Sequence, residues 1–175
     1  EGWWYKPEYL FNELNINSAF SRPAHNEIVK LGATEKYTIK GYAYTGGGRK
    51  VTRVEVSLDG GKSWRLCDVT YPEEENSVAP SYGRYWCWVF WSTEVETFEF
   101  LEATAGVGEV CCRAWDEANN CQPPNITWNL MGMGNNCHFR AKIHPEKVDG
   151  HMSLRFEHPT IAGPNEGGWM KKPAA

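Results

Sequence analysis

The residues with the greatest chemical potential are carboxylates, histidines and thiols, and their spacing argues against catalysis by this chain alone. Asp116 and Glu117 are neighbours at the end of a predicted strand, where adjacent side chains point apart, so we expect a solvated turn there rather than an acid–base pair. No Gly-rich loop opens a helix in the way that phosphate binding requires. The histidines lack HExxH spacing and the cysteines contain no CxxC pair, so no metal site is predicted among His138, His144, His151 and His158 or Cys67, Cys87, Cys111, Cys112, Cys121 and Cys137.

Two further motifs could bind carbohydrate. Residues 57–64 match the pattern SxDxGxxW, the Asp box of sialidase-like repeats, but a propeller needs several copies and this chain has one. We therefore expect a hairpin turn held by the Asp59 carboxylate, with Trp64 packed beneath it. Trp86, Trp88 and Trp91 could form a sugar-binding platform, but core and interface roles are favoured; alternation places the first two on one strand face and Trp91 on the other.

Composition limits the classes of protein that these motifs could serve. The chain has 175 residues, which indicates one domain, and 41% of them are hydrophobic, which is enough for a packed core. A formal charge of −4 argues against a general nucleic-acid binder. No apolar run is long enough to span a membrane. Nine Trp and an aromatic content of 14% require either a large core or a working surface.

The N-terminus and the cysteines bear on the cellular compartment. The chain starts at Glu1 with no visible secretion signal, so we expect an internal fragment or a processed form. Six cysteines would suit a disulfide framework in a secreted protein, but a chain of this length can build a core without them. We predict reduced, mostly buried thiols in a cytoplasmic protein, and we interpret the glycosylation sequon at residues 125–127 as chance.

Short runs of β-branched and aromatic residues, separated by turn signals, dominate the chain. They predict strands and no helix, with an acidic, proline-flanked surface loop at residues 72–80. The predicted fold class is all-β: an immunoglobulin-like (E-set) antiparallel β-sandwich with an N-terminal arm and a C-terminal tail. The predicted strands are 37–44, 51–58, 64–71, 85–91, 110–116, 139–143 and 153–156.

One distinctive run carries a family resemblance. Residues 128–140 read WNLMGMGNNCHFR, which resembles the WN-x-MGMMNNCWFR signature of eukaryotic assimilatory nitrate reductase, a member of the sulfite oxidase superfamily. The resemblance extends over nearly the whole chain, and the other matching segments are 3–9, 12–18, 41–44, 53–56, 59–61, 85–88, 113–116 and 156–160.

The resemblance implies the dimerisation domain of a molybdenum-cofactor oxidoreductase. Residues 1–19 would end the molybdenum-cofactor domain and form a connector, residues 20–160 would be the Ig-like dimerisation domain, and residues 161–175 would begin a linker to a haem domain. The full enzyme would reduce nitrate to nitrite with electrons from NAD(P)H, passed through FAD and a b5-type haem to molybdenum-molybdopterin. This fragment is expected to be inactive, to bind no cofactor alone, to form a homodimer, and to contact the preceding molybdenum-cofactor domain.

The same resemblance implies roles for six residues. Trp128, Asn129 and Met131 would lie at the rim of the substrate pocket. The sulfite-oxidising branch usually has Arg where Met131 stands; an Arg fork suits a dianion, whereas a neutral thioether leaves less positive charge for monoanionic nitrate. Met131 as an adaptable packing residue is the alternative. The residues expected to shape the loop, or else to follow ordinary turn chemistry, are Asn135, Asn136 and Arg140.

The run departs from the family pattern at two positions. Gly134 replaces a usual Met and His138 replaces a usual Trp, so the local packing of the loop is expected to differ. Two rival functions stay open from the sequence. One is a secreted module that binds carbohydrate or another ligand through exposed Trp and Tyr, and the other is the dimerisation domain of a sulfite oxidase.

Overall fold

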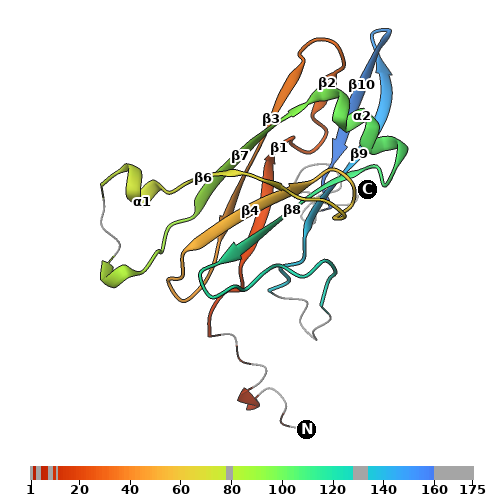
Figure 1. Cartoon of the computed structure of the whole chain (residues 1–175). Coiled ribbons are helices and arrows are strands. Elements are labelled where there is room, and N and C mark those ends of the chain that lie inside the picture. The colour runs from red at the N-terminus through yellow and green to blue at the C-terminus, as the bar shows by residue number, and fades with distance from the viewer. Residues whose placement is uncertain are drawn as a thin grey trace, which may run out of the picture.

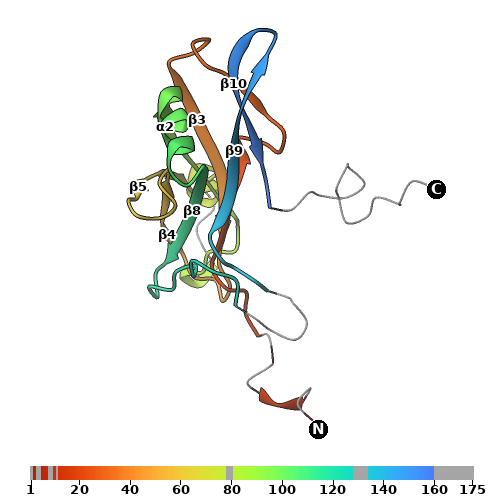
Figure 2. The ribbon, with the colours of Figure 1, turned by 90° about the vertical axis from the view of Figure 1, so that its right-hand side faces the viewer.

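The computed structural model describes residues 2, 5–7, 10, 12–77, 81–127 and 134–159, and within them two antiparallel sheets pack face to face (Figures 1 and 2). Sheet A has the strand order β1-β3-β7-β6, and sheet B has the order β2-β10-β9-β8-β4-β5. The strands of sheet A are β1 (Asn17–Arg22), β3 (Lys36–Tyr44), β7 (Val89–Glu96) and β6 (Asp68–Thr70). Those of sheet B are β2 (Ile28–Lys30), β10 (His151–Glu157), β9 (Phe139–Val148), β8 (Glu109–Asp116), β4 (Val51–Ser57) and β5 (Arg65–Leu66).

The all-β sandwich prediction is therefore confirmed, whereas the immunoglobulin-like (E-set) assignment stays a prediction. Residues 158–159 follow β10, and the predicted tail at 161–175 lies outside the described residues. Strand β1 begins at Asn17, so Asn17, Ser18 and Ala19 of the predicted connector belong to sheet A.

The core lies between the sheets because the strands alternate apolar and polar positions. Ile39 of β3, Trp91 of β7 and Val54 of β4 are each at most 2% exposed. Gly41 has a strict packing role. A Cβ atom there would lie 2.2 Å from both the Trp91 ring and the Ala19 carbonyl oxygen, so only glycine lets the indole reach the backbone.

Three predicted strands are wrong in their extent. The predicted strand 139–143 continues to Val148 as β9. The segment 64–71 divides into β5, which pairs with β4 in sheet B, and β6, which pairs with β7 in sheet A. The predicted strand 85–91 begins only at Val89. Its first residues leave the sheet because the backbone N–H groups of Trp86 and Cys87 donate to the Glu73 carboxylate, at 2.9 and 3.2 Å, instead of to a neighbouring strand.

The prediction of no helix is also wrong. Helix α2 (Thr97–Ala105) closes the end of the sandwich away from the N-terminus (Figure 1), and a capping box between Glu96 and Glu99 starts it. Phe100 on this helix is fully buried between Tyr37 of sheet A and Phe156 of sheet B. Only a narrow face of α2 is buried, and the exposed Phe98 breaks the helical spacing of its apolar residues. The sequence therefore lacks a clear amphipathic helix pattern at 97–105.

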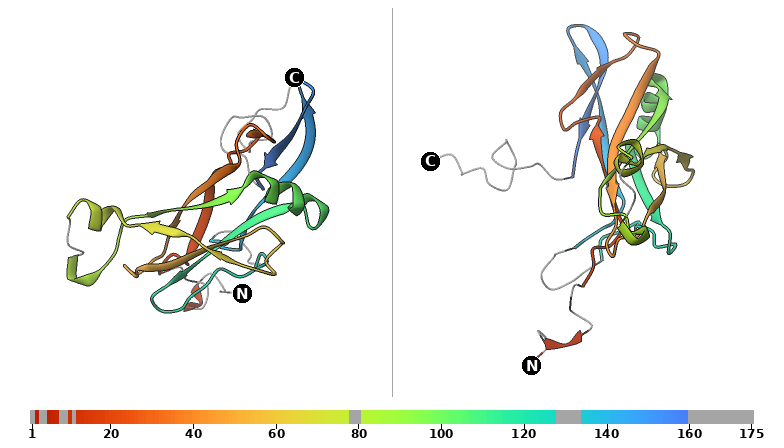
Figure 3. Two further views of the ribbon diagram at one scale, coloured as in Figure 1. Left: turned by 45° about the horizontal axis from the view of Figure 1, so that its top comes forward. Right: turned by 90° about the vertical axis from the view of Figure 1, so that its left-hand side faces the viewer.

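The predicted acidic loop at 72–80 contains a short helix, α1 (Pro72–Glu75), which lies outside the sandwich beyond β6 (Figure 3, left). A single 3-10 turn (Ser81–Gly83) follows. The Asp-box segment forms the predicted hairpin turn between β4 and β5: the Asp59 carboxylate accepts hydrogen bonds from Ser57, Lys62 and Ser63, and Trp64 donates to the Gly61 carbonyl at 3.1 Å.

Thiol reactivity tests the cysteine assignment directly. All six cysteines are free, and Cys67, Cys111 and Cys112 are buried. Burial raises the pKa of Cys67 to about 12 and that of Cys111 to about 11, so almost no thiolate is present at neutral pH. We expect six reactive thiols in denaturant and at most three fast-reacting thiols in the native chain, measured with a chromogenic disulfide reagent. Fewer than six thiols in denaturant would contradict the structure.

Candidate functional site

The segment between β8 and β9, residues 117–138, carries the run that the sequence singles out. The described parts of this segment, 117–127 and 134–138, lie at the same end of the sandwich as residues 12–16, which precede β1 (Figures 1 and 2). The predicted pocket-rim residues Trp128, Asn129 and Met131 fall outside the described residues. The site is therefore built from the two ends of this segment, 117–127 and 134–138, and from the connector, residues 12–16, that leads into β1.

Gln122 joins β1, β8 and the far end of the segment. Its side chain is 2% exposed, and its carbonyl oxygen accepts from the Ser18 hydroxyl at 2.6 Å and from the Ala114 N–H at 3.0 Å. Its amide nitrogen donates to Asn17 Oδ1 at 3.1 Å and to the Cys137 carbonyl at 3.0 Å. One buried amide therefore holds together strands of both sheets and the returning end of the segment.

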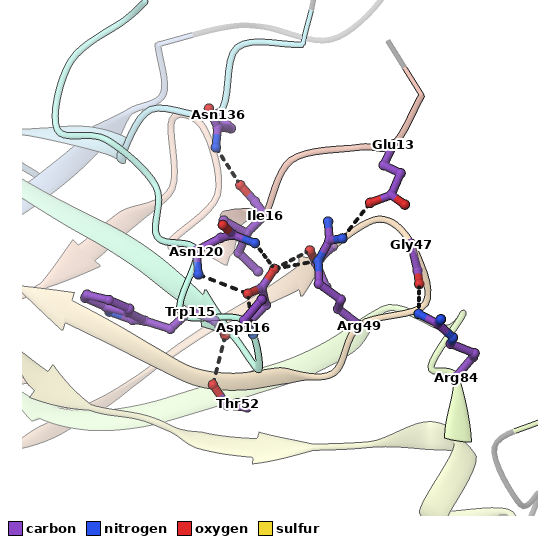
Figure 4. Close-up of polar contacts among 12 residues, drawn as sticks. Glu13, Ile16, Gly47, Arg49, Thr52, Arg84, Trp115, Asp116, Asn120 and Asn136 are labelled. Atoms are coloured by element: carbon purple, nitrogen blue, oxygen red, sulfur yellow. Dashed lines mark hydrogen bonds and ion pairs between the residues drawn. The ribbon is translucent and has the colours of Figure 1, made fainter. Parts of the chain in front are cut away.

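Asp116, the last residue of β8, is the second centre of the site. Its side chain has no exposed surface and accepts five hydrogen bonds (Figure 4). Oδ1 accepts from the backbone N–H groups of Ala118 and Asn120, and Oδ2 accepts from the Thr45 hydroxyl, the Asn120 amide and Arg49 Nε, each at 2.9–3.0 Å. The carboxylate thus shapes the turn after β8 and ties it to the β3–β4 loop.

The expectation that Asp116 lies in a solvated turn is wrong. The backbone and Arg49 surround the carboxylate and exclude water, which sequence spacing alone does not reveal. Burial opposes ionisation, but the hydrogen bonds from Asn120, Thr45 and Arg49 outweigh it and hold the pKa of Asp116 below its usual range. Glu117, by contrast, is exposed. The two carboxylates therefore do not form an acid–base pair, as predicted.

The connector is bound to the same network. Arg49 pairs with Glu13 through Nη1 as well as with Asp116 through Nε, so one guanidinium links the connector to the end of β8 (Figure 4). The Gly46 N–H donates to the Leu14 carbonyl at 2.9 Å. On the other side, the Asn136 amide donates to the Ile16 carbonyl at 2.9 Å. The β3–β4 loop and the returning end of the 117–138 segment thus hold the connector between them.

Arg140 and the Asn135–Asn136 pair stand where the segment returns to β9. Arg140 Nη1 pairs with Glu109 on β8, and Nη2 donates to the Pro124 carbonyl at 3.2 Å, so this side chain spans both ends of the segment. Asn135 is half-buried beside Asn136. The positions of these three residues suit a role in shaping the loop, and that role stays a prediction.

His138, where the family usually has Trp, packs against Trp64 with ring centroids 5.1 Å apart. It is 7% exposed, and its Nδ1 has no hydrogen-bond partner in the part of the chain that the structure describes. Burial lowers the pKa of His138, and the cations of Arg140 and Arg113 add to this effect, so the ring is neutral at pH 7. It fills the space of a larger ring instead of offering a charge.

A cleft of about 400 Å³ lies between the connector and the two ends of the segment, lined by Glu13, Ile16, Asn120, Cys121 and Asn136 among others. Its carboxylate, Glu13, is engaged by Arg49. In the described residues there is no group of three His, Cys, Asp or Glu side chains placed to hold a metal ion. The arrangement is suited to holding a loop and a connector in register, and offers no poised nucleophile or base.

Sequence reasoning missed Gln122, Arg49, Glu13 and Ser18 as parts of this site. Each is a common surface residue type in an unremarkable context, and contacts such as Ser18–Gln122 join residues 104 positions apart. A weak signal was present in Asp116: an Asp that ends a strand and precedes Asn119-Asn120 suits a carboxylate that caps a turn.

Residues 8–146 match the family described as Mo-co oxidoreductase dimerisation domain. The chain belongs to this family. It is 57% identical over 171 residues to the NADH nitrate reductase of Volvox carteri and 55% identical over 178 residues to the NAD(P)H nitrate reductase of Hordeum vulgare; these alignments cover 97% and 98% of the chain. The chain spans 19% of the length of each of these relatives.

A solved structure supports the same fold. The structure of the sulfane dehydrogenase SoxCD of Paracoccus pantotrophus aligns with 85% of this chain and with 33% of the SoxCD chain, with a TM-score of 0.54 and 23% sequence identity.

The two nitrate reductase relatives show that this dimerisation domain corresponds to a region of nitrate reductases, as the sequence predicted. The findings do not support the alternative of a secreted carbohydrate-binding module.

Proposed function

We propose that this chain is the homodimerisation domain of a molybdopterin-dependent nitrate reductase, and that its 128–133 loop reaches the rim of the active site formed by the preceding domain. The observation that carries the proposal is the match to a dimerisation domain over residues 8–146 together with high identity to nitrate reductases. The full enzyme reduces nitrate to nitrite in the cytoplasm with electrons from NAD(P)H. The six free thiols fit that compartment.

The contacts at the two ends of the 117–138 segment support the proposal that the 128–133 loop reaches the rim of the active site. The connector leads toward the preceding domain. Asn136 donates to Ile16 of the connector and Gln122 donates to Asn17 of β1. Asp116, which binds Asn120, is linked to Glu13 of the connector through Arg49. In the sequence, Trp128, Asn129 and Met131 lie between these two anchored ends of the segment. Met131 is the residue that sets anion preference in this proposal, and Asn135, Asn136 and Arg140 shape the loop.

We assign none of the cofactors of the full enzyme, which are molybdenum-molybdopterin, haem and FAD, to the described residues. Cys67, Cys111 and Cys112 are buried with raised pKa values and His138 is enclosed, so these four side chains are not presented as ligands. No redox step is assigned to this chain. We propose instead that other domains bind these cofactors, and that this chain positions the 128–133 loop and forms the homodimer. No helix in the described part is both long and apolar enough to cross a bilayer.

The oligomeric state tests the assembly role. Light scattering coupled to size exclusion should give a mass twice the 19.9 kDa of one chain, because a closed C2 dimer is the commonest symmetric assembly. The expected mass should persist on dilution to the low micromolar range if the interface is obligate in type. A mass of 19.9 kDa at high micromolar concentration would contradict the proposal for this chain.

A further inference from the structure

The outer face of sheet A carries an unusual row of aromatic side chains. On β3, Gly41 and Ala43 face the core, so alternation turns Tyr42 and Tyr44 outward. On β7, Val89 and Trp91 face the core, so Phe90 points outward, and Trp88 directly precedes this strand. We call Tyr42, Tyr44, Trp88 and Phe90 the aromatic face.

The aromatic face is ordered without being covered. The Trp88 indole stacks on Tyr42 with centroids 4.8 Å apart and planes at 17°, and on Tyr44 at 5.4 Å and 22°. The Tyr44 hydroxyl also accepts from Asn17 at 3.2 Å. Even so, Trp88 is 53% exposed and Phe90 is 54% exposed. The rings are preorganised by contacts within the chain, which lowers the entropy that a partner must overcome.

The outer face of sheet B is dominated by charged side chains, and its aromatic rings are capped by them: Arg113 lies 3.9 Å over the Trp64 ring and Arg53 lies 4.4 Å over the Trp115 ring. There the alternate positions of β4, β8 and β9 carry charged side chains that pair across strands, as in Arg113–Glu55 and Arg140–Glu109. Charged pairs of this sort are well solvated and do not need to be covered by a partner. Exposed aromatic rings on sheet A are less well solvated, so this contrast indicates that a partner contacts the aromatic face and not the outer face of sheet B.

Its size suits a protein interface. An aromatic side chain buries roughly 150–250 Å², so the exposed parts of these rings and of neighbouring Trp86 offer roughly 300–500 Å² of apolar surface, more than isolated surface residues provide. A standard interface needs about 800 Å² on each partner, with an apolar centre and a polar rim. The rim is present along the same strands and carries both charges, at Lys36, Lys40, Asp68, Glu94 and Glu96.

We propose that the aromatic face is the surface through which two copies of this chain form a symmetric dimer. The inference rests on the proposed homodimer and specifies where it forms. In a C2 contact the same patch meets itself, so each buried ring counts twice, and rim charges of both signs on adjacent strands allow acidic residues to oppose basic ones. The connector is bound to Arg49, Gly46 and Asn136, none of which belongs to the aromatic face.

A matched pair of substitutions tests the location. Phe90→Glu places a charge at the centre of the aromatic face, and Phe98→Glu makes the same change on α2, where Phe98 is 63% exposed. In light scattering and sedimentation of the 175-residue chain, Phe90→Glu should raise the dimer dissociation constant roughly 100-fold or more, because hot-spot aromatics contribute twice in a two-fold interface. Phe98→Glu should leave the constant unchanged. Trp88→Ala, which adds no charge, should weaken the dimer in the same direction.

The outcomes separate the two proposals. A wild-type dimer that persists in Phe90→Glu and Trp88→Ala would overturn the aromatic face as the interface while leaving the homodimer intact, and would point to the preceding domain as the occupant. Equal loss in Phe90→Glu and Phe98→Glu would overturn it as well. A wild-type monomer at high micromolar concentration would overturn both proposals. Unchanged far-ultraviolet circular dichroism of each variant verifies that it folds.

Discussion

Asp116→Asn is expected to lower the free energy of unfolding by about 3 kcal/mol or more. Asparagine keeps the shape of the side chain but replaces one acceptor oxygen with an NH₂ group. That group would face either the backbone N–H groups of Ala118 and Asn120 or the donors of Thr45 and Arg49, so buried donors lose their partner in either orientation. Urea unfolding followed by Trp fluorescence measures the loss.

The same substitution changes the pH dependence of stability. The native pKa of Asp116 lies below its unfolded value, so the stabilisation is present above about pH 4, the usual pKa of Asp, and is lost as the pH falls through the native pKa. The gap in stability between wild type and Asp116→Asn should therefore be largest near neutral pH and shrink under acid. Glu117→Gln is the matched control, since its carboxylate is exposed, and it should cost less than about 0.5 kcal/mol. Equal effects of the two substitutions would contradict the buried network.

Gln122→Ala is expected to cost about 2–4 kcal/mol. The substitution leaves the Ala114 N–H without its acceptor, leaves the Ser18 hydroxyl only the weak Cys112 sulfur acceptor, and removes the donor to the Cys137 carbonyl. The loss should be local as well as global. Amide hydrogen exchange should speed up at 134–138 and at the start of β1 more than in β4, because the amide joins those segments.

Gln122→Met separates packing from hydrogen bonding. Methionine restores most of the volume of glutamine without its polar atoms, so exchange at 134–138 should stay fast in this variant even where stability partly recovers. Asn125→Ala, an exposed change in the same segment, should alter neither quantity. If exchange in Gln122→Ala increased uniformly over the sheets, the amide would be a general core contact and not a joint for the loop.

The sequence predicted most of the fold from local alternation, because a half-buried strand repeats every two residues whatever its partners are. Alternation identified β3, β4, β8, β9 and β10, and the Asp-Gly-Gly signal identified the turn before β5. Prediction from alternation failed where contacts between distant residues determine the backbone conformation. The sequence predicts a strand at Trp86 and Cys87, but the Glu73 carboxylate of α1, 13 and 14 residues earlier in the chain, accepts hydrogen bonds from their N–H groups.

The contacts that build the candidate site could not be predicted from the sequence. The 128–140 run drew attention to the segment between β8 and β9 through its resemblance to nitrate reductase, and in the structure Asn136 donates to the Ile16 carbonyl of the connector. The joints themselves, Gln122 and Arg49, act through partners far away in sequence, and no local pattern reveals such pairs. His138 illustrates a further limit: a titratable residue in the signature run is held neutral by burial and by Arg140, which only three-dimensional packing determines.

The kinetics of Met131→Arg in the proposed full-length nitrate reductase test the central claim most directly. We expect an added guanidinium at the proposed pocket rim to change the KM for nitrate on the order of tenfold, or to bring measurable sulfite oxidation, because it favours a dianion over a monoanion. The matched change Met152→Arg, at an exposed position on β10, should leave both unchanged. Unaltered kinetics toward both anions in Met131→Arg would contradict a role for this loop at the active-site rim.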